Sequence, residues 1–124
     1  MKILVVEDSR FLRLSITRAL TGAGHAVICA ADGEQVLGLA REHAPDLILL
    51  DVMLPRMSGP DVLKVLKKDA TTAPIPVMML TSLSSKNATL LEKEGARSFF
   101  EKSDSMLAEG PGSLLAAIDR LLKK

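Results

Sequence analysis

The stretch Leu47–Pro55 constrains the fold most, because an uninterrupted apolar run ends in one carboxylate and is followed by a proline-containing turn. The four apolar residues from Leu47 to Leu50 predict a strand that is buried on both faces, as in parallel sheets covered by helices. Such a strand tolerates an ionisable residue only at its carboxyl end, where open α/β sheets carry their chemistry. We therefore expect Asp51 at the carboxyl edge of a central strand.

Further short apolar runs predict four more strands, at residues 2–6, 26–30, 75–80 and 97–101. Helices are predicted after each strand, because apolar residues recur there at intervals of three and four. They span about residues 10–23, 33–44, 60–68, 84–94 and 113–122. Five strands alternating with five helices predict an α/β, flavodoxin-like, doubly wound parallel sheet with strand order 2-1-3-4-5. The 124 residues contain no repeat, low-complexity tract or linker, so we expect one domain over residues 1–124.

Capping residues support these helix boundaries. Ser9 is predicted to cap the first helix, Asp32–Gly33 to open the second, and Ser113 to cap the last. Pro60 falls in the first turn of the third helix, where its missing N–H does least harm.

Composition limits the function classes. Sixteen Lys and Arg residues against fifteen Asp and Glu residues give a formal charge of +1, which supplies no field for direct nucleic-acid or anionic-membrane binding. No apolar stretch approaches the roughly 18 residues of a membrane span, so we expect no membrane insertion and a cytoplasmic location. Cys29 is the single cysteine, and its apolar neighbours predict a small buried core residue.

Chemically useful side chains follow four of the five predicted strands. Glu7 and Asp8 follow the first, Asp51 the third, Thr81 the fourth and Lys102 the fifth. Parallel strands bring these ends to one edge, and three carboxylates held close predict a hard divalent cation, Mg²⁺ or Mn²⁺. The hydroxyl and the ammonium could then hold a phosphoryl group attached to Asp51.

The chain resembles a response-regulator receiver domain of two-component signalling over essentially its full length, in the manner of a chemotaxis-type single-domain regulator. The joint order and spacing of four motifs carry the resemblance. They are Val5-Val6-Glu7-Asp8-Ser9, the run from Asp51 to Gly59, Thr81-Ser82, and Phe99-Phe100-Glu101-Lys102.

The resemblance implies that Asp51 accepts a phosphoryl group from a histidine kinase or phosphotransfer protein. It also implies that the chain is a signalling switch and no enzyme, promoting only its own phosphorylation and dephosphorylation. The metal would be bound by Asp8, Asp51 and the main-chain carbonyl of Met53, with Glu7 acting through water. Thr81 and Lys102 would bind the phosphoryl oxygens. Phe99 would occupy the aromatic switch position, on the face that contacts a downstream target protein.

Three features depart from the family pattern. Ser103 follows the lysine where the family usually has proline, and Phe99 lacks the hydroxyl that a tyrosine would offer. The polar loop from Ser103 to Gly112 is longer than usual before the last helix.

Other functions fit the sequence less well. A haloacid-dehalogenase-like phosphatase needs a second carboxylate two residues after its nucleophile, where this chain has Met53. A flavin- or nucleotide-binding module needs a Gly- or hydroxyl-rich phosphate loop after the first strand, where this chain has Glu7 and Asp8. The alternatives within the family are a receiver module excised from a larger DNA-binding or enzymatic response regulator, and a phosphorylation-independent pseudo-receiver.

Overall fold

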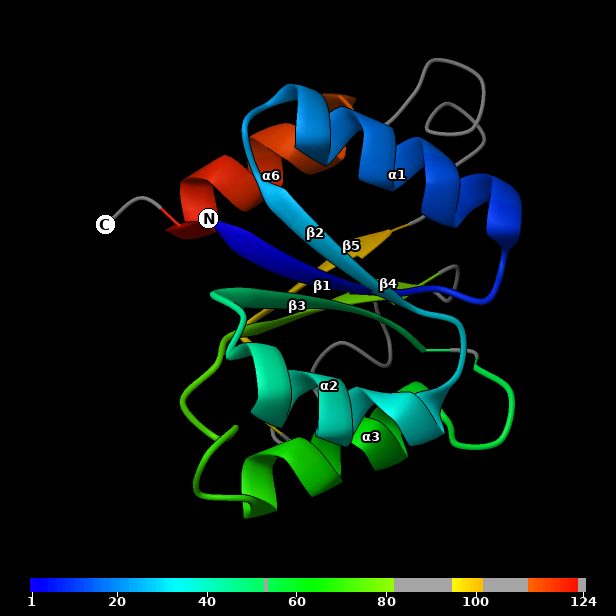
Figure 1. Ribbon diagram of the computed structural model, residues 1–124, viewed down its shortest axis with the longest axis vertical. Helices are drawn as coiled ribbons and strands as arrows, with labels where there is room; N and C mark the ends of the chain where they lie inside the picture. The colour runs from blue at the N-terminus through cyan, green and yellow to red at the C-terminus, as the bar shows by residue number, and fades with distance from the viewer. Residues whose placement is uncertain (53, 82–94, 102–111, 123–124) are drawn as a thin grey trace.

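The computed structural model describes residues 1–52, 54–81, 95–101 and 112–122. Within these residues, five strands form one parallel sheet in the order β2-β1-β3-β4-β5, as predicted. Figure 1 shows helices α1 and α6 on one face of this sheet and helices α2 and α3 on the other. The strands are β1 (Lys2–Val6), β2 (Ala26–Ala30), β3 (Leu47–Asp51), β4 (Val77–Thr81) and β5 (Ser98–Glu101).

Alternate residues of the inner strands belong to two separate hydrophobic cores. Leu4, Ile48 and Met79 face one side, where they pack with the apolar stripes of α2 (Val36–His43) and α3 (Gly59–Lys68). Their neighbours in sequence face the other side, against α1 (Arg10–Gly22) and α6 (Gly112–Leu122). All five residues of β3 are buried, as expected for a central parallel strand.

The predicted helix starts are largely confirmed. The Ser9 hydroxyl accepts the main-chain N–H of Leu12 at 3.3 Å and caps α1, and the Asp32 carboxylate caps a short 3₁₀ turn, η1 (Gly33–Gln35), that leads into α2. The Ser58 hydroxyl caps α3, in which Pro60 lies in the first turn. These caps satisfy main-chain donors that a helix leaves unpaired at its start.

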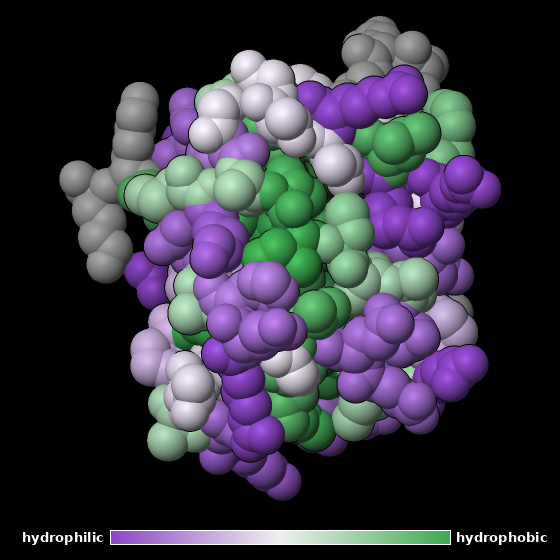
Figure 2. Space-filling model, in the orientation of Figure 1, coloured by the Kyte–Doolittle hydropathy of each residue, from purple (hydrophilic) through white to green (hydrophobic). Residues whose placement is uncertain are grey.

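Two expectations about individual residues are wrong. Cys29 is exposed, because it lies on β2, which pairs only with β1 and so forms an edge of the sheet. Figure 2, drawn in the orientation of Figure 1, shows apolar side chains gathered in a band on the face of the molecule turned to the viewer. Ser113 lies inside α6, which begins at Gly112, so Ser113 is no N-cap.

Two boundaries shift by one or two residues, as element ends commonly do. β4 begins at Val77 and not at Ile75, because Pro76 has no N–H to give to the sheet. β5 begins at Ser98 and not at Arg97. The predicted helix over residues 84–94 lies outside the described residues.

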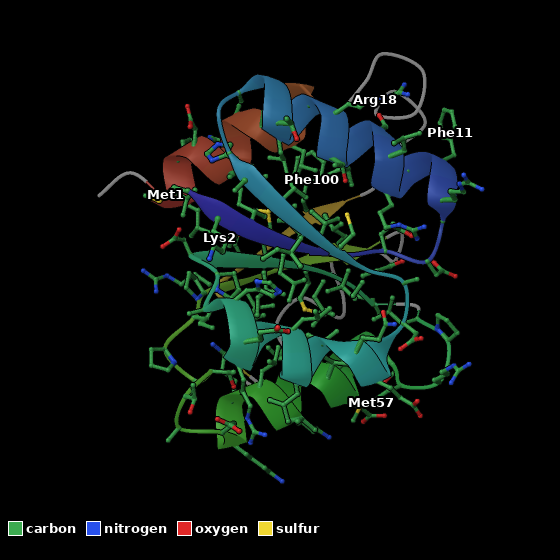
Figure 3. All side chains as sticks on the ribbon, in the orientation of Figure 1. Met1, Lys2, Phe11, Arg18, Met57 and Phe100 are labelled. Atoms are coloured by element: carbon green, nitrogen blue, oxygen red, sulfur yellow. The ribbon has the colours of Figure 1, made fainter. Side chains whose placement is uncertain are left out.

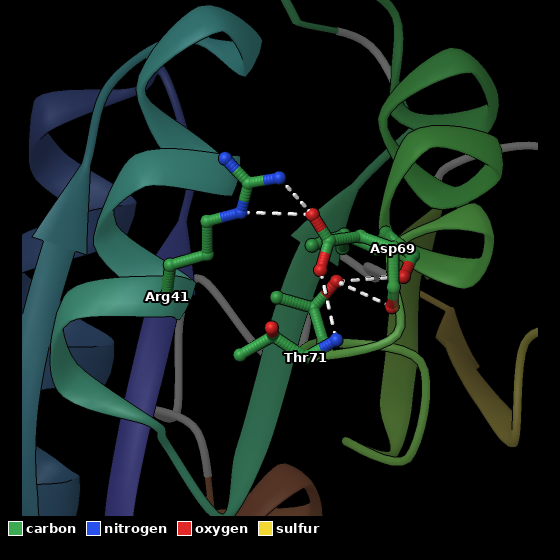
Figure 4. A network of polar contacts seen from close by, with 5 residues as sticks. Arg41, Asp69 and Thr71 are labelled. Carbon is green, nitrogen blue, oxygen red and sulfur yellow. Dashed lines mark hydrogen bonds and ion pairs between the residues drawn. The ribbon is translucent and has the colours of Figure 1, made fainter.

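A polar network joins the ends of α2 and α3 (Figure 4). The Arg41 guanidinium donates to the Asp69 carboxylate, with 2.8 Å between Arg41 Nε and Asp69 Oδ2, and the Thr71 main-chain N–H donates to Asp69 Oδ1 at 2.8 Å. These hydrogen bonds, above all those from Arg41, hold the pKa of Asp69 below its usual range. Asp69 therefore stays ionised and links the two helices.

Among the described helices, none combines the length and the apolar character needed to cross a membrane.

Candidate functional site

Three carboxylates meet at the carboxyl edge of the sheet. Each of Glu7, Asp8 and Asp51 offers one oxygen, and these oxygens all lie within 4.8 Å of one another. Glu7 and Asp51 are buried, with 1% and 3% of their surface exposed, whereas Asp8 is exposed. Two acids of the cluster are therefore buried, and the third is open to solvent.

The end of β1 positions two of these acids. The Glu7 main-chain N–H donates to the Ala30 carbonyl at 3.1 Å, which continues the β1–β2 pairing by one residue. The Glu7 carboxylate accepts the Ser9 main-chain N–H at 2.9 Å, and the Arg13 guanidinium donates to the Glu7 carbonyl at 2.7 Å. The turn from β1 into α1 is thus held by both its main chain and its side chains.

The end of β3 positions the third acid. The Val52 main-chain N–H donates to the Leu80 carbonyl at 2.9 Å, so β3 stays paired with β4 one residue beyond Asp51. The Gly59 main-chain N–H then donates to the Val52 carbonyl at 2.9 Å, which brings the start of α3 back against the strand end. Asp51 is therefore buried between a neighbouring strand and a helix start.

The loop between β3 and α3 lies against the turn before α2. Gly33 is so close to this loop that a Cβ built on it would lie 2.4 Å from the Met57 carbonyl oxygen. Arg56 in the same loop has a positive φ of 68°, and its guanidinium lies 3.7 Å from the Asp32 carboxylate and 3.5 Å from that of Glu34. The connections that follow β2 and β3 thus contact each other at the carboxyl edge of the sheet.

The remaining predicted site residues are only partly described. The main chain of Thr81 ends β4, one residue beyond the residue that pairs with Asp51, so Thr81 shares the edge with the acids. Phe99 lies on β5 and its main chain pairs with that of Met79. Met53 and Lys102 lie outside the described residues.

The site therefore combines three converging acids with a hydroxyl-bearing strand end on a flavodoxin-like sheet. The response regulator receiver domain family matches residues 3–108 of the chain. The chain belongs to this family. A receiver domain is typically a signalling module without enzymatic output.

Similar proteins include both curated sequences and solved structures. Protein PilH of Pseudomonas aeruginosa is 34% identical to this receiver domain over 102 residues, which cover 82% of the chain and 84% of PilH. The chemotaxis protein CheY4 of Vibrio cholerae matches with a TM-score of 0.87 at 30% identity, covering 98% of each chain. The Mn²⁺-bound form of response regulator Rcp1 matches with a TM-score of 0.84 at 25% identity, covering 99% of this chain and 95% of Rcp1.

Other curated relatives are longer than this receiver domain. The chain spans 31% and 48% of the length of two probable transcriptional regulators called ycf27, from Guillardia theta and Porphyridium aerugineum. The family assignment consequently concerns the receiver domain, and any output activity requires a separate argument.

Sequence reasoning missed two residues that position the acids. No sequence pattern singles out Arg13, because a side chain that reaches back to a preceding turn leaves no periodic signal. Gly59 is expected only as the last residue of the family motif that begins at Asp51, although it contacts the main chain of Asp51 itself. The Ser-Gly-Pro sequence at 58–60 could have suggested a tight approach at this point, since glycine permits close main-chain contact.

Proposed function

We propose that this receiver domain is a phosphoacceptor switch in which Asp51 is the nucleophile. One Asp51 carboxylate oxygen attacks the phosphorus of a phosphohistidine, an O–P bond forms, the P–N bond breaks, and the released imidazole takes up a proton. The observation that carries the proposal is the convergence of Glu7, Asp8 and Asp51 at the sheet edge. Like charges held this close repel one another, and a bound cation would relieve that repulsion.

The donor set of the site fits a hard divalent cation. Carboxylate oxygens within 4.8 Å of one another are the ligand type that Mg²⁺ and Mn²⁺ prefer, and the exposed Asp8 side leaves an open approach. Asp8 and Asp51 would bind the cation directly with the Met53 carbonyl, and Glu7 through water. When bound, the cation offsets negative charge as the carboxylate attacks. The Mn²⁺-bound form of Rcp1 supports this assignment by analogy.

Thr81 and Lys102 complete the proposed phosphoryl site. Each would donate to one phosphoryl oxygen, and charge-assisted hydrogen bonds of this kind are worth about 1.5–3 kcal/mol each. Such bonds draw the end of β4 toward Asp51 and bias the conformation of the neighbouring β5 at Phe99. The surface around Phe99 would then change and control the binding of a downstream target protein.

The phosphodonor would be a histidine kinase or a phosphotransfer protein. Near the acids, α1 presents two exposed apolar side chains, with 69% of Phe11 and 46% of Leu14 exposed, and Figure 3 shows Phe11 projecting outward from the start of α1. This apolar surface beside the three acids offers a docking face for such a donor. A cytoplasmic location and a single receiver domain over residues 1–124 belong to the same proposal.

A second candidate is a receiver module that belongs to a larger DNA-binding or enzymatic response regulator. The chain covers only 31% and 48% of the two ycf27 proteins, and this difference in length favours the second candidate. Both candidates require the same chemistry at Asp51, so they differ only in what the switch controls.

The direct test is phosphorylation by acetyl phosphate or phosphoramidate, followed by intact-mass spectrometry. We expect one added phosphoryl group in the presence of Mg²⁺ and none in excess chelator, because the site needs the cation's charge. Equal labelling with and without chelator would contradict the cation's role, and no labelling in Mg²⁺ would favour the pseudo-receiver.

A further inference from the structure

Arg13 lies one turn into α1, and its side chain reaches back to the main chain that carries two of the three acids. Its Nη1 donates to the Glu7 carbonyl at 2.7 Å and lies 3.5 Å from the Asp8 carbonyl. A single guanidinium therefore spans the consecutive peptide units that connect β1 to α1.

Further hydrogen bonds fix both ends of this contact. On the strand side, the Glu7 main-chain N–H is held by the Ala30 carbonyl at 3.1 Å. On the helix side, the Arg13 main-chain N–H donates to the Ser9 carbonyl at 2.8 Å, and the Thr17 hydroxyl donates to the Arg13 carbonyl at 2.7 Å. Arg13 itself is half-buried. Its side chain is thus a short link between a fixed helix turn and a fixed strand end.

The acids have a physical reason to need such a link. Carboxylate oxygens within 4.8 Å of one another repel, and Asp8 is exposed, so its turn could relax outward and separate the charges. A hydrogen bond from Arg13 Nη1 to the main chain opposes this relaxation, because it ties the turn to α1.

We propose that Arg13 is a positioning residue that holds the Glu7–Asp8 turn so that its carboxylates meet that of Asp51. The inference rests on the proposed function, because it assigns Arg13 a part in divalent-cation binding at the same site. Loss of a residue that orients metal ligands commonly lowers metal affinity about 10- to 100-fold. We expect a loss of roughly tenfold or more for Arg13→Gln.

Removal of the Arg13 charge has an opposing effect on cation affinity. A positive charge near the site repels a cation, so its loss alone would strengthen binding. Arg10 offers a matched control, since it is the exposed first residue of α1 and carries the same charge beside the same acids. Arg10→Gln therefore measures the effect of charge without the link to the turn, and Arg13→Lys keeps the charge on a shorter side chain.

The test measures Mn²⁺ binding by the electron paramagnetic resonance signal of the free ion, and amide hydrogen exchange at residues 7–9 in chelator. We expect Arg10→Gln to bind Mn²⁺ as tightly as the wild type or more tightly. Arg13→Gln and Arg13→Lys should both bind it more weakly and exchange faster at residues 7–9. If Arg13→Gln fails to fold, Arg13→Lys alone carries the comparison.

Two results would count against the account in different ways. If an Arg13 variant that folds binds Mn²⁺ as tightly as Arg10→Gln, the positioning role is wrong while the proposed function stands. If the wild-type chain itself binds no Mn²⁺, the cation site of the proposed function is wrong and the inference fails with it.

Discussion

Gly59 and Asp51 approach so closely that a Cβ built on Gly59 would lie 2.3 Å from the Asp51 carbonyl oxygen and 2.7 Å from the Val52 Cα. Both obstacles are main-chain atoms of a buried strand end, so they cannot move aside cheaply. We predict that Gly59→Ala lowers the free energy of unfolding by about 1–3 kcal/mol, the usual cost of overpacking. Urea denaturation measures this change.

Gly38 is the matched control for that substitution. It lies inside α2, and a Cβ built on it meets no atom within 4 Å. Gly38→Ala should therefore stabilise the fold by roughly 0.5–1 kcal/mol, because alanine is the better helix former. Equal effects of the two substitutions would show that the contact with Asp51 does not restrict residue 59.

Ala44 ends α2 in the left-handed conformation, with φ 46° and ψ 59°. This conformation costs an L-residue about 1–2 kcal/mol, and glycine avoids it while losing roughly 0.5–1 kcal/mol more chain entropy on folding. We predict that Ala44→Gly raises the free energy of unfolding by up to about 1 kcal/mol. Denaturation in urea again provides the measurement.

Ala23 supplies the comparison, since it ends α1 with a negative φ of −88°. At Ala23 glycine relieves no left-handed conformation, so Ala23→Gly should lower the free energy of unfolding by about 0.5–1 kcal/mol. The same sign of change for both variants would contradict the account of Ala44.

The hydrogen bonds from Arg41 that lower the pKa of Asp69 predict a pH-dependent contribution to stability. A lowered carboxyl pKa stabilises the folded state at pH values above the ordinary pKa, and this contribution disappears as the pH falls through the folded-state pKa. Asp69→Asn should therefore be less stable than the wild type at about pH 7, and the difference should shrink toward about pH 3.5. A difference that stays constant between these pH values would contradict this role of the carboxylate.

Sequence patterns predicted the sheet well because its central strands are defined by burial. The run from Leu47 to Leu50 could be read as buried on both faces without knowing its neighbours, and the structure leaves none of it exposed. Cys29 is predicted buried from its apolar neighbours alone, although the predicted strand order already places its strand at an edge of the sheet, where side chains are less covered.

The meeting of the three acids was predicted for the same reason. Glu7, Asp8 and Asp51 could be expected together because parallel strands end at one edge of the sheet. The link from Arg13 could not, since a side chain reaching a main-chain carbonyl has no sequence signature.

We expect phosphorylation to change the backbone conformation of the paired strands β4 and β5. Met79 pairs with Phe99, and Thr81, at the end of the same strand, pairs with Glu101. We predict that beryllofluoride, which mimics a bound phosphoryl group, shifts the backbone NMR signals of Thr81 and Phe99. Asp51→Asn provides the control that should not respond. Changes confined to residues next to Asp51 would mean that the switch does not reach the surface around Phe99.

We predict that Asp51 alone accepts the phosphoryl group, and intact-mass spectrometry measures this. Wild-type protein and Asp51→Asn are treated with acetyl phosphate and Mg²⁺ under the same conditions. We expect one added phosphoryl group on the wild type and none on Asp51→Asn, because an amide at this position offers no nucleophilic carboxylate. Equal labelling of the two proteins would contradict it.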